Sequence, residues 1–194
     1  MAQIALEKTE PVAASVQANP APLGLSGFAV TTFLLSIVNA GIIAKTDANF
    51  LGLAVAFGGL GQLLAGMWEF RAGNTLGATA FSSYGAFWIS VAVGILTKTL
   101  GGAGYSYYLL TWGILTFVFL LSALRTNGAL IAVFLFLTLT FLALAIGAFA
   151  ASNTWIGIGG WLGIITAIVA EYTALAGILS SDKSAFQLPT FPMS

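Results

Sequence analysis

The sequence predicts an all-α membrane protein with six transmembrane helices in each protomer. Hydrophobic residues make up 59% of the 194 residues and charged residues only 6%, whereas a soluble domain carries about 25% charged residues. Six apolar runs are long enough to cross a bilayer, which takes about 20 residues. Because so few charges cannot cover a surface that faces water, we expect the chain to lie in a lipid bilayer.

The six predicted helices follow one another with short connections, so neighbours are expected to be antiparallel. The first three end at "AKTDAN", "EFRAGN" and "TKTLGGAG", and the last three at "RTNG", "SNT" and "SSDKS". Their expected ranges are 23–43, 50–68, 75–96, 105–124, 129–151 and 155–179. Residues 1–18 are expected to form a flexible cytoplasmic tail, 19–180 the six-helix domain and 181–194 a second cytoplasmic tail.

The positions of the basic residues predict the orientation of the chain. All of them fall in connections or tails: on the side of both termini Lys8, Arg71, Arg125 and Lys183, and on the other side Lys45 and Lys98. Cytoplasmic loops carry the excess of Lys and Arg. We therefore expect a multi-pass plasma-membrane protein with both termini in the cytoplasm.

Several functional classes lose support from what the composition lacks. The chain has no Cys and no His, so it lacks a thiolate nucleophile and the commonest metal ligand. Its formal net charge is zero, which gives no basis for binding nucleic acid. No helix carries the paired carboxylates that general acid–base catalysis would use. We expect neither an enzyme nor a bound metal or cofactor.

Polar residues inside the apolar runs predict a path through the bundle, because such side chains in a span tend to face the bundle interior or a watery cavity. A Ser or Thr can bond to its own helix, but the amides of Asn39 and Gln62 have too many donors and acceptors for that. Helical spacing gives three stripes: Phe28, Thr32, Ser36 and Asn39 on the first helix; Gly58, Gln62, Ala65 and Glu69 on the second; and Thr75, Thr79, Ser83 and Ser90 on the third. Three stripes on three helices suggest one shared polar path.

Two carboxyl groups lie within or beside the spans. Glu69 closes the second span near Arg71 and is either an interfacial carboxylate or a proton carrier. Glu171 lies deeper in the sixth span and is either a protonatable group in the path or a residue bonded at a subunit contact. No Lys or Arg lies in the middle of a span, so an anion in the path would be held by neutral N–H and O–H donors or by helix ends.

Glycines four residues apart predict places where helices come close. Gly73 with Gly77, and Gly159 with Gly163, have this spacing. Small residues at that interval let helix backbones approach each other in lipid. We expect these glycines at helix contacts, within one subunit or between subunits.

The stretch "NPAPLGLSGF", residues 19–28, opens the first span with two prolines. Pro lacks an N–H group and restricts the residue before it, so the helix is expected to start after Pro22, with Asn19 as a capping residue. Gly24 permits a close approach of the backbone. Free N–H groups at the positive end of the helix dipole favour a carboxylate, and Asn19, Leu23 and Gly24 are therefore predicted to bind substrate.

The same motif is similar to the signature of the acetate uptake transporter family, the acetate–succinate permeases. Three further stretches extend the resemblance over essentially all six spans: "GGLGQLLAGMWEFRAGNTLGATAFSSYGAFW" at 58–88, "FLTLTFLALAIG" at 136–147 and "GGWLGI" at 159–164. The resemblance implies transport of acetate and related short carboxylates such as succinate, with or without proton coupling. It also implies a six-helix protomer that assembles as a hexamer, with a path through each protomer.

The resemblance further implies a narrow apolar constriction of Phe, Tyr and Leu. By their places in the motifs these are Phe28, Tyr84 in "SSYGAFW" and Leu137 in "FLTLTF". The remaining predicted substrate-binding residues are Thr32, Asn39, Gln62 and Tyr84, and the proton-coupling candidates are Glu69 and Glu171. Glu171 stands where an apolar residue is expected in the bacterial members.

Two alternatives to carboxylate transport stay open at this point. The fold also resembles the hexameric acid-gated urea channels, which suggests a channel for a small neutral amide such as urea, although the chain has no His for that kind of gate. The other alternative is a sensory membrane protein that transports nothing. Flux measurements with acetate and urea separate these possibilities.

Overall fold

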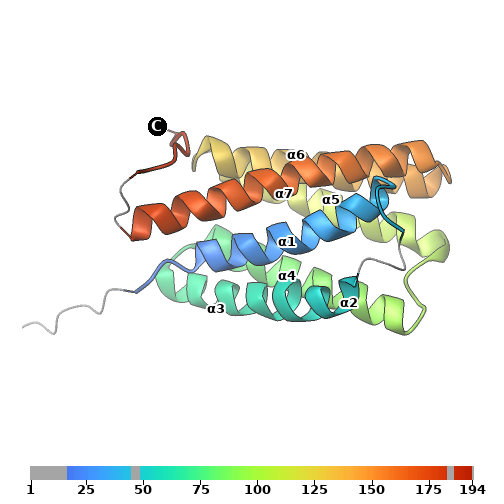
Figure 1. Ribbon diagram of the computed structural model, residues 1–194, viewed down its shortest axis with the longest axis horizontal. Coiled ribbons are helices and arrows are strands. Elements are labelled where there is room, and N and C mark those ends of the chain that lie inside the picture. The colour runs from blue at the N-terminus through green and yellow to red at the C-terminus, as the bar shows by residue number, and fades with distance from the viewer. Residues whose placement is uncertain (1–16, 45–48, 183–185, 194) are drawn as a thin grey trace, which may run out of the picture.

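Six long helices form one bundle in which consecutive helices run in opposite directions (Figure 1). The computed structural model describes residues 17–44, 49–182 and 186–193. Within them the elements are α1 (Ala21–Asn39), α2 (Phe50–Leu53), η2 (Ala54–Gly61), α3 (Gln62–Ala72), α4 (Thr75–Leu96), α5 (Gly102–Ala123), α6 (Gly128–Phe149) and α7 (Asn153–Ser181). Since α2, η2 and α3 form one continuous span, six helices are long and apolar enough to cross a membrane, which confirms the predicted fold class.

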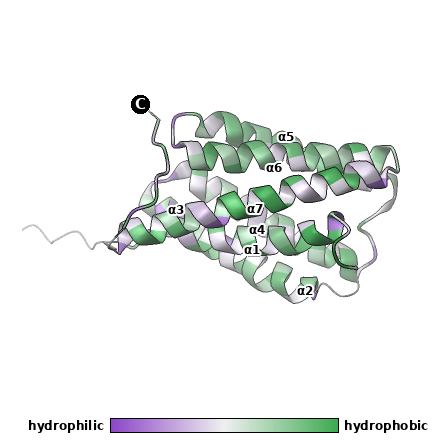
Figure 2. Cartoon of the chain, turned by 45° about the horizontal axis from the view of Figure 1, so that its top comes forward, coloured by the Kyte–Doolittle hydropathy of each residue, from purple (hydrophilic) through white to green (hydrophobic). Residues whose placement is uncertain are grey.

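The helices close into a ring around the interior of the bundle. Going round it, α5 packs on α6, α6 on α7, α7 on α1, α1 on η2 and α3, and α3 on α4. The backbones of α4 and α5 approach each other at few points, and large aromatic side chains fill the space between them. Hydrophobic residues cover most of each helix, and hydrophilic residues gather at the helix ends (Figure 2).

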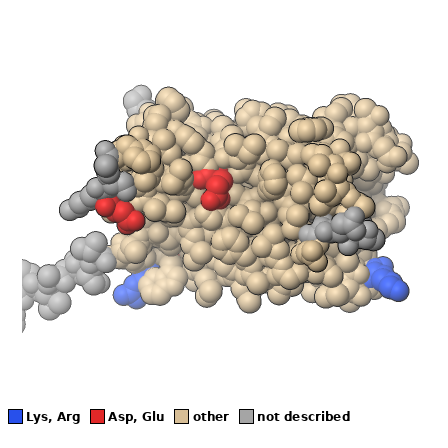
Figure 3. Space-filling view, viewed as in Figure 1, with Lys and Arg blue, Asp and Glu red and all other residues tan. Residues whose placement is uncertain are grey.

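Both ends of the described chain lie at the same end of the bundle (Figure 1), which we call the terminal end; the opposite end is the distal end. Arg71 in the last turn of α3 and Arg125 after α5 lie at the terminal end, and Lys98 after α4 lies at the distal end. Figure 3 shows no basic side chain between the two ends of the visible face. The other three basic residues of the orientation argument, Lys8, Lys45 and Lys183, lie outside the described residues, as does most of the expected N-terminal tail.

The first helix begins two residues earlier than predicted, at Ala21. Pro20 occupies the N-cap position and Pro22 the second helical position, where a missing N–H group costs nothing because the first amides of a helix have no internal partner. The side-chain oxygen of Asn19 accepts a hydrogen bond from the amide of Ala21 at 3.0 Å. The two prolines therefore start the helix rather than delay it.

The second span runs to Ala72 instead of ending at residue 68, and its middle part, η2, is a π-helix. This segment lies between two glycines of neighbouring helices. A Cβ atom on Gly27 of α1 would stand 2.7 Å from the carbonyl oxygen of Phe57, and one on Gly85 of α4 would stand 2.8 Å from that of Gly59. Backbone therefore meets backbone on both sides of η2, and a side chain at either glycine would force them apart.

The predicted glycine contact on the last helix is confirmed. In the other predicted pair, Gly73 ends a helix and packs against nothing among the described residues. A Cβ on Gly159 would stand 2.7 Å from the side chain of Leu144 on α6, and one on Gly163 would meet Ser36 on α1. Gly73, in contrast, has no neighbour within 4 Å and a φ of +76°. It ends α3 in the left-handed conformation that glycine adopts most readily, so its prediction as a packing residue was wrong.

The end of the chain, which was expected to be a tail, runs back along the start of α6. The amides of Gly128 and Ala129, in the first turn of that helix, donate to the carbonyl oxygens of Phe191 at 2.8 Å and Thr190 at 3.2 Å. First-turn amides have no partner inside their own helix. Residues 186–193, which we call the C-terminal segment, therefore supply the carbonyls that the start of α6 needs.

Candidate functional site

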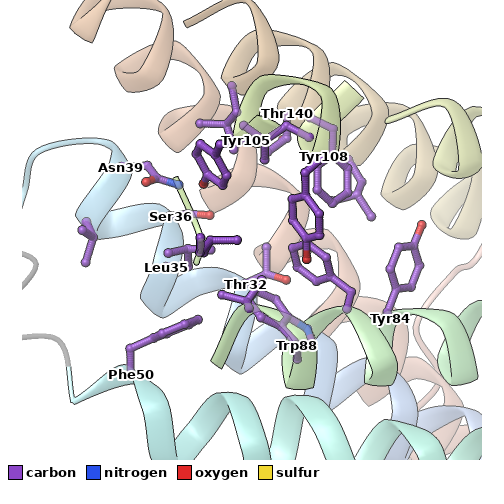
Figure 4. A pocket seen from close by; sticks show the side chains of 18 of the residues that line it. Thr32, Leu35, Ser36, Asn39, Phe50, Tyr84, Trp88, Tyr105, Tyr108 and Thr140 are labelled. Carbon is purple, nitrogen blue, oxygen red and sulfur yellow. The ribbon is translucent and has the colours of Figure 1, made fainter. Parts of the chain in front are cut away.

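A cavity of about 150 Å³ lies in the distal half of the bundle, and we call it the distal cavity. The whole predicted stripe of α1 faces it: Phe28, Thr32, Ser36 and Asn39 all line its wall. Figure 4 shows three of these side chains, Thr32, Ser36 and Asn39, following one another along α1 toward the pocket. The helical spacing of this stripe therefore led to the correct face.

The other walls of the distal cavity are mostly apolar and aromatic. No Lys, Arg, Asp or Glu is among its lining residues in the described part of the chain, which besides the α1 stripe are Leu35, Val38, Phe50, Tyr84, Phe87, Trp88, Val91, Ile95, Leu100, Tyr105, Tyr108, Leu109, Leu137, Thr140, Phe141 and Leu144. A carboxylate here would meet no cation and would depend on neutral donors.

A second, more polar cavity of about 470 Å³ opens among the helix starts at the terminal end, and we call it the terminal cavity. Three asparagines at the starts of α1, α4 and α6 line it, namely Asn19, Asn74 and Asn127. Gln187 and Thr190 from the C-terminal segment add to its wall. The segment that satisfies the start of α6 therefore also forms part of this cavity.

The three asparagines use their side-chain oxygens in a similar way. The side-chain oxygen of each accepts from an amide in the first turn of its helix: from Ala21 at 3.0 Å for Asn19, from Gly77 at 3.1 Å for Asn74, and from Leu130 at 2.9 Å for Asn127. Because the oxygens are used in this way, the side-chain N–H₂ groups are what the asparagines can offer elsewhere. The side chain of Asn74 and the carboxyl group of Glu69 both lie against Gly77. The sequence analysis missed Asn127, although its place directly before an apolar run is typical of a capping residue.

One helical turn of large side chains separates the two cavities. Three helices, α1, α4 and α6, each contribute a residue to the distal cavity and the residue three positions earlier to the terminal cavity. These pairs are Phe28 and Leu25, Tyr84 and Phe81, and Leu137 and Phe134. All six side chains are buried. The three residues predicted for the constriction thus lie at the boundary between two cavities.

Tyr84 is held at this boundary by contacts on several sides. Its ring centroid lies 5.4 Å from that of Phe28 and 5.8 Å from that of Phe119 on α5. Its hydroxyl donates to Thr116 Oγ1 at 3.0 Å, and the Thr116 hydroxyl donates in turn to the Trp112 carbonyl at 2.7 Å. The hydroxyl that we expected to donate to a substrate carboxylate therefore donates to α5 instead.

The second predicted stripe does not join the path. Gln62 and Glu69 are 0% and 1% exposed, yet neither lines the distal or the terminal cavity. Gln62 packs against Gly27 of α1, with its Cγ 3.4 Å from where a Cβ would stand. Glu69 approaches the terminal cavity only from behind its wall, where its carboxyl carbon lies 3.0 Å from where a Cβ on Gly77 would stand. The face predicted from helical spacing is buried, but it is buried between helices.

Three further predicted residues lie away from both cavities. Leu23 is 45% exposed and lies in a surface hollow together with Trp68 and Arg71. Gly24 is buried beneath the ring of Phe81, whose nearest atoms would be 2.7 Å from a Cβ. Thr79, from the third stripe, is exposed and donates to its own helix. The opening motif therefore contributes Asn19 to the terminal cavity, while Gly24 lets an aromatic ring of the barrier pack against α1.

Glu171 lies on the outside of the bundle. Its carboxyl accepts a hydrogen bond from Ser26 of α1 at 3.5 Å. It borders a shallow, apolar surface hollow formed with Val30, Phe33 and Ile168. Figure 3 shows one acidic patch near the middle of a face that is otherwise almost free of charge. Glu171 lines neither the distal nor the terminal cavity, which gives no support to a place in the path. Its place at a subunit contact stays a prediction.

Two cavities that lie toward opposite ends of a six-helix membrane bundle, with a plug of large side chains between them, define a membrane transport protein. The chain belongs to the GPR1/FUN34/yaaH family, which it matches over residues 3–194. The family that the motifs indicated is thereby confirmed.

Some relatives of this chain carry the names of transporters. It is 44% identical over 201 residues to acetate permease A of Emericella nidulans, covering 91% of this chain and 67% of the relative. It is 38% identical over 178 residues to the succinate-acetate/proton symporter SatP of Escherichia coli, covering 89% of this chain and 94% of the relative. A solved structure of the bacterial acetate channel SatP superposes with a TM-score of 0.84 at 38% identity, over 90% of this chain and 99% of that one.

Proposed function

We propose that this chain is a plasma-membrane transporter or channel for acetate and related short carboxylates such as succinate. The observation that carries the proposal is the pair of cavities joined end to end at the turn of Phe28, Tyr84 and Leu137, with no cationic side chain on either wall among the described residues. Neutral donors hold a small anion weakly. Weak binding suits passage, because a substrate must leave each site as readily as it enters.

The terminal cavity is suited to receive a carboxylate. Three helices begin at its wall, and the positive ends of their dipoles favour an anion. The side-chain N–H₂ groups of Asn19 and Asn127 are donors placed at two of these helix starts. Together these groups replace part of the water that a carboxylate loses on entering the protein.

The constriction acts as a dry gate in this mechanism. Burying a carboxylate without partners is very costly, and the six side chains at the boundary offer apolar surface. The protonated acid crosses such a barrier more easily than the anion, so flux rises as the external pH falls. Glu69 is our candidate for proton coupling, because its buried carboxyl group lies against Gly77, which lines the terminal cavity together with Asn74.

We propose further that the protein assembles as a homohexamer in which Glu171 lies at a contact between protomers. The number six comes from the resemblance. The contact is supported by the position of Glu171, since an ionisable side chain facing lipid costs about 2.5–3.5 kcal/mol or more at mid-span. A neighbouring protomer over the hollow of Val30, Phe33 and Ile168 would cover it. Native mass measurement in mild detergent tests this, and a stable monomer would contradict it.

Both termini are proposed to lie in the cytoplasm, which makes the terminal end the cytoplasmic one. The described basic residues support this orientation, with Arg71 and Arg125 at the terminal end and Lys98 at the distal end. Single cysteines in place of Arg71 and Lys98 can be labelled in intact cells with an impermeant thiol reagent. Labelling of the residue 98 variant alone is expected, and the reverse result would invert the topology.

The transport function is tested with purified protein in liposomes. Uptake of labelled acetate is compared with uptake of labelled urea under the same gradient, and protein-free liposomes give the background. Saturable acetate uptake above that background is expected. Uptake of urea but not of acetate would establish the neutral-amide alternative, and uptake of neither would favour a protein that transports nothing.

A further inference from the structure

The wall of the distal cavity holds two buried hydrogen-bond donors that no part of the described protein satisfies. Thr32 is 5% exposed and Trp88 is 2% exposed. Thr32 Oγ1 and Trp88 Nε1 have no hydrogen-bond partner among the residues that the structure describes. Both residues line the cavity. Leaving a buried donor unpaired lowers stability, and because these two lie on the wall of a cavity, a ligand there could accept hydrogen bonds from both.

Thr32 differs in this respect from the other threonines that lie beyond the first turn of a span. Thr31, its neighbour, donates to the carbonyl of Gly27 at 2.8 Å. The same bond to the carbonyl four residues earlier is made by Thr79, Thr111, Thr116, Thr138, Thr140, Thr166 and Thr173. That bond is the usual way for a threonine to satisfy its hydroxyl inside a helix. The hydroxyl of Thr32 is left for the cavity.

Helical geometry places the two donors at the same level along the bundle. Thr32 follows Phe28 by four residues on α1, and Trp88 follows Tyr84 by four residues on α4. The two helices run in the same direction, from the terminal to the distal end, and the rings of Phe28 and Tyr84 are 5.4 Å apart. Both donors therefore lie one turn, about 6 Å, to the distal side of the constriction. Figure 4 shows the two side chains next to each other in the pocket.

The surroundings of Trp88 fix its indole ring. Its centroid lies 4.9 Å from that of Phe87 and 5.7 Å from that of Phe50, in edge-on arrangements. A ring held by two others cannot turn its N–H group away without repacking them. The N–H group is thus a preorganised donor, and the aromatic walls around it are suited to a methyl group.

We propose that Trp88 Nε1–H and Thr32 Oγ1–H bind the carboxylate of the substrate in the distal cavity, one donor to each oxygen; this rests on the proposed transport function. A cavity of about 150 Å³ is large enough for benzene in another protein, so acetate, which has fewer non-hydrogen atoms, fits. An indole N–H group donates and cannot accept. A carboxylate has an acceptor oxygen for each of the two donors and a charge that strengthens both hydrogen bonds, whereas an amide has one acceptor oxygen and no charge, so this site favours a carboxylate.

The first experiment measures the concentration dependence of acetate uptake in liposomes. Thr32→Val and Trp88→Phe each remove one donor and keep most of the volume. Each is expected to raise the apparent KM for acetate about tenfold, because a hydrogen bond to a charged group contributes about 1.5 kcal/mol or more and 1.4 kcal/mol corresponds to a factor of ten. Thr31→Val and Trp161→Phe are the controls. Thr31 already donates to its own helix, Trp161 is 56% exposed, and both controls should keep the original KM.

The second experiment detects binding without transport. Protein labelled with ¹⁵N at tryptophan is titrated with sodium acetate, with sodium chloride at matched ionic strength and acetamide as controls. The indole N–H resonance of Trp88, identified by its loss in Trp88→Phe, should move saturably with acetate and stay in place with both controls. In Thr32→Val the movement should need about tenfold more acetate.

The outcomes distinguish a failure of this proposed binding site from a failure of the transport proposal. If the protein transports acetate but the Trp88 resonance does not move and both variants keep the original KM, the proposed binding site is wrong and the transport proposal is supported. If acetate moves the resonance but no uptake is measured, the binding site is supported and the transport proposal fails. Movement by acetamide as strong as that by acetate would overturn the proposed carboxylate preference.

Discussion

The hydroxyl of Tyr84 on α4 donates to Thr116 Oγ1 on α5 at 3.0 Å, across the part of the bundle where the two backbones stay apart. Thr116 is 0% exposed and bonded to its own helix through its hydroxyl hydrogen. The ring that forms one side of the constriction is thus anchored at its far end. The position of the Tyr84 ring between the two cavities therefore depends on Thr116, which lines neither cavity.

Thr116→Val should loosen the constriction. Valine has the shape of threonine but cannot accept the hydrogen bond, so the Tyr84 hydroxyl would be buried without a partner, at a cost of about 1–3 kcal/mol in the free energy of unfolding. The ring becomes free to turn, and we expect uptake of lactate relative to acetate to rise severalfold. Thr111→Val is the matched control, because Thr111 is exposed and donates to its own helix. An unchanged lactate-to-acetate ratio in Thr116→Val would mean that packing alone positions the ring.

Phe28→Ala should widen the constriction directly. The ring centroid of Phe28 lies 5.4 Å from that of Tyr84, and removal of the Phe28 ring leaves space between the two cavities. Uptake of succinate relative to acetate is expected to increase, and Tyr84→Ala should act in the same direction. Because a Phe→Ala change in a core costs about 3–5 kcal/mol, Phe28→Leu is measured beside it as the milder variant. Phe33→Ala, at a ring that is 43% exposed on the outer face, should leave the ratio as it is.

Gly27→Ala should destabilise the bundle without touching either cavity. The added methyl group would stand 2.7 Å from the carbonyl oxygen of Phe57, which is backbone and cannot turn aside. Overpacking of this kind costs about 1–3 kcal/mol, and we expect a lower thermal unfolding midpoint in detergent. Gly157→Ala is the control, since a Cβ there has no neighbour within 4 Å. It should leave the midpoint unchanged or raise it, because alanine favours a helix over glycine.

Removal of the C-terminal segment should open the start of α6. The hydroxyl of Tyr172 on α7 donates to the carbonyl of Pro189 at 2.7 Å and holds the middle of this segment. A chain that stops after residue 185 loses the carbonyls that the amides of Gly128 and Ala129 use. Hydrogen exchange at these two amides should speed up, because local opening governs exchange. Tyr172→Phe should give a smaller change in the same direction, and Tyr107→Phe none; equal protection in the full and shortened chains would show that the contact is loose in solution.

Acetate uptake should depend on pH in a way that Glu69 modifies. Acetic acid protonates at about pH 5, close to side-chain carboxyls at about 4, so the share of neutral acid and the flux rise as the external pH falls toward that value. If Glu69 carries the proton, Glu69→Gln flattens this profile while Glu171→Gln keeps it. Uptake is measured in liposomes between about pH 5 and pH 8. Identical profiles for both variants and the original protein would assign the pH response to the substrate alone.

Helical periodicity predicted the fold and one wall of the distal cavity. It failed where a face buried between helices has the same pattern as a face that lines a cavity. The stripe of α1 lines the distal cavity as expected. Gln62 and Glu69 share a face with equal regularity, but their face packs against neighbouring helices. A one-dimensional pattern shows which residues turn inward; it does not distinguish a helix contact from a cavity wall. Thr79 faces outward and its hydroxyl donates to its own helix, a bond that buried threonines such as Thr31 make as well.

Other features of the structure could not be predicted from the sequence. Helical spacing places Trp88 beside the polar stripe of the third helix, but the sequence does not show that its N–H group is unpaired. The C-terminal segment is held through backbone carbonyls, which every residue possesses. Asn127 is the exception, since a capping residue before an apolar run is a local signal that a search for helix starts would have found.

The π-helix Ala54–Gly61 divides the second span into two parts that are joined by an expanded turn. A π-helical turn is an α-helical turn with an additional residue. Loss of a single residue from this segment would let it relax to the ordinary helix, because the widened turn already absorbs the additional residue. Gln62 and Glu69 would then keep the faces that they now turn toward the neighbouring helices. The same deletion inside α3 would instead rotate everything after it by about 100°, the angle per residue at 3.6 residues per turn.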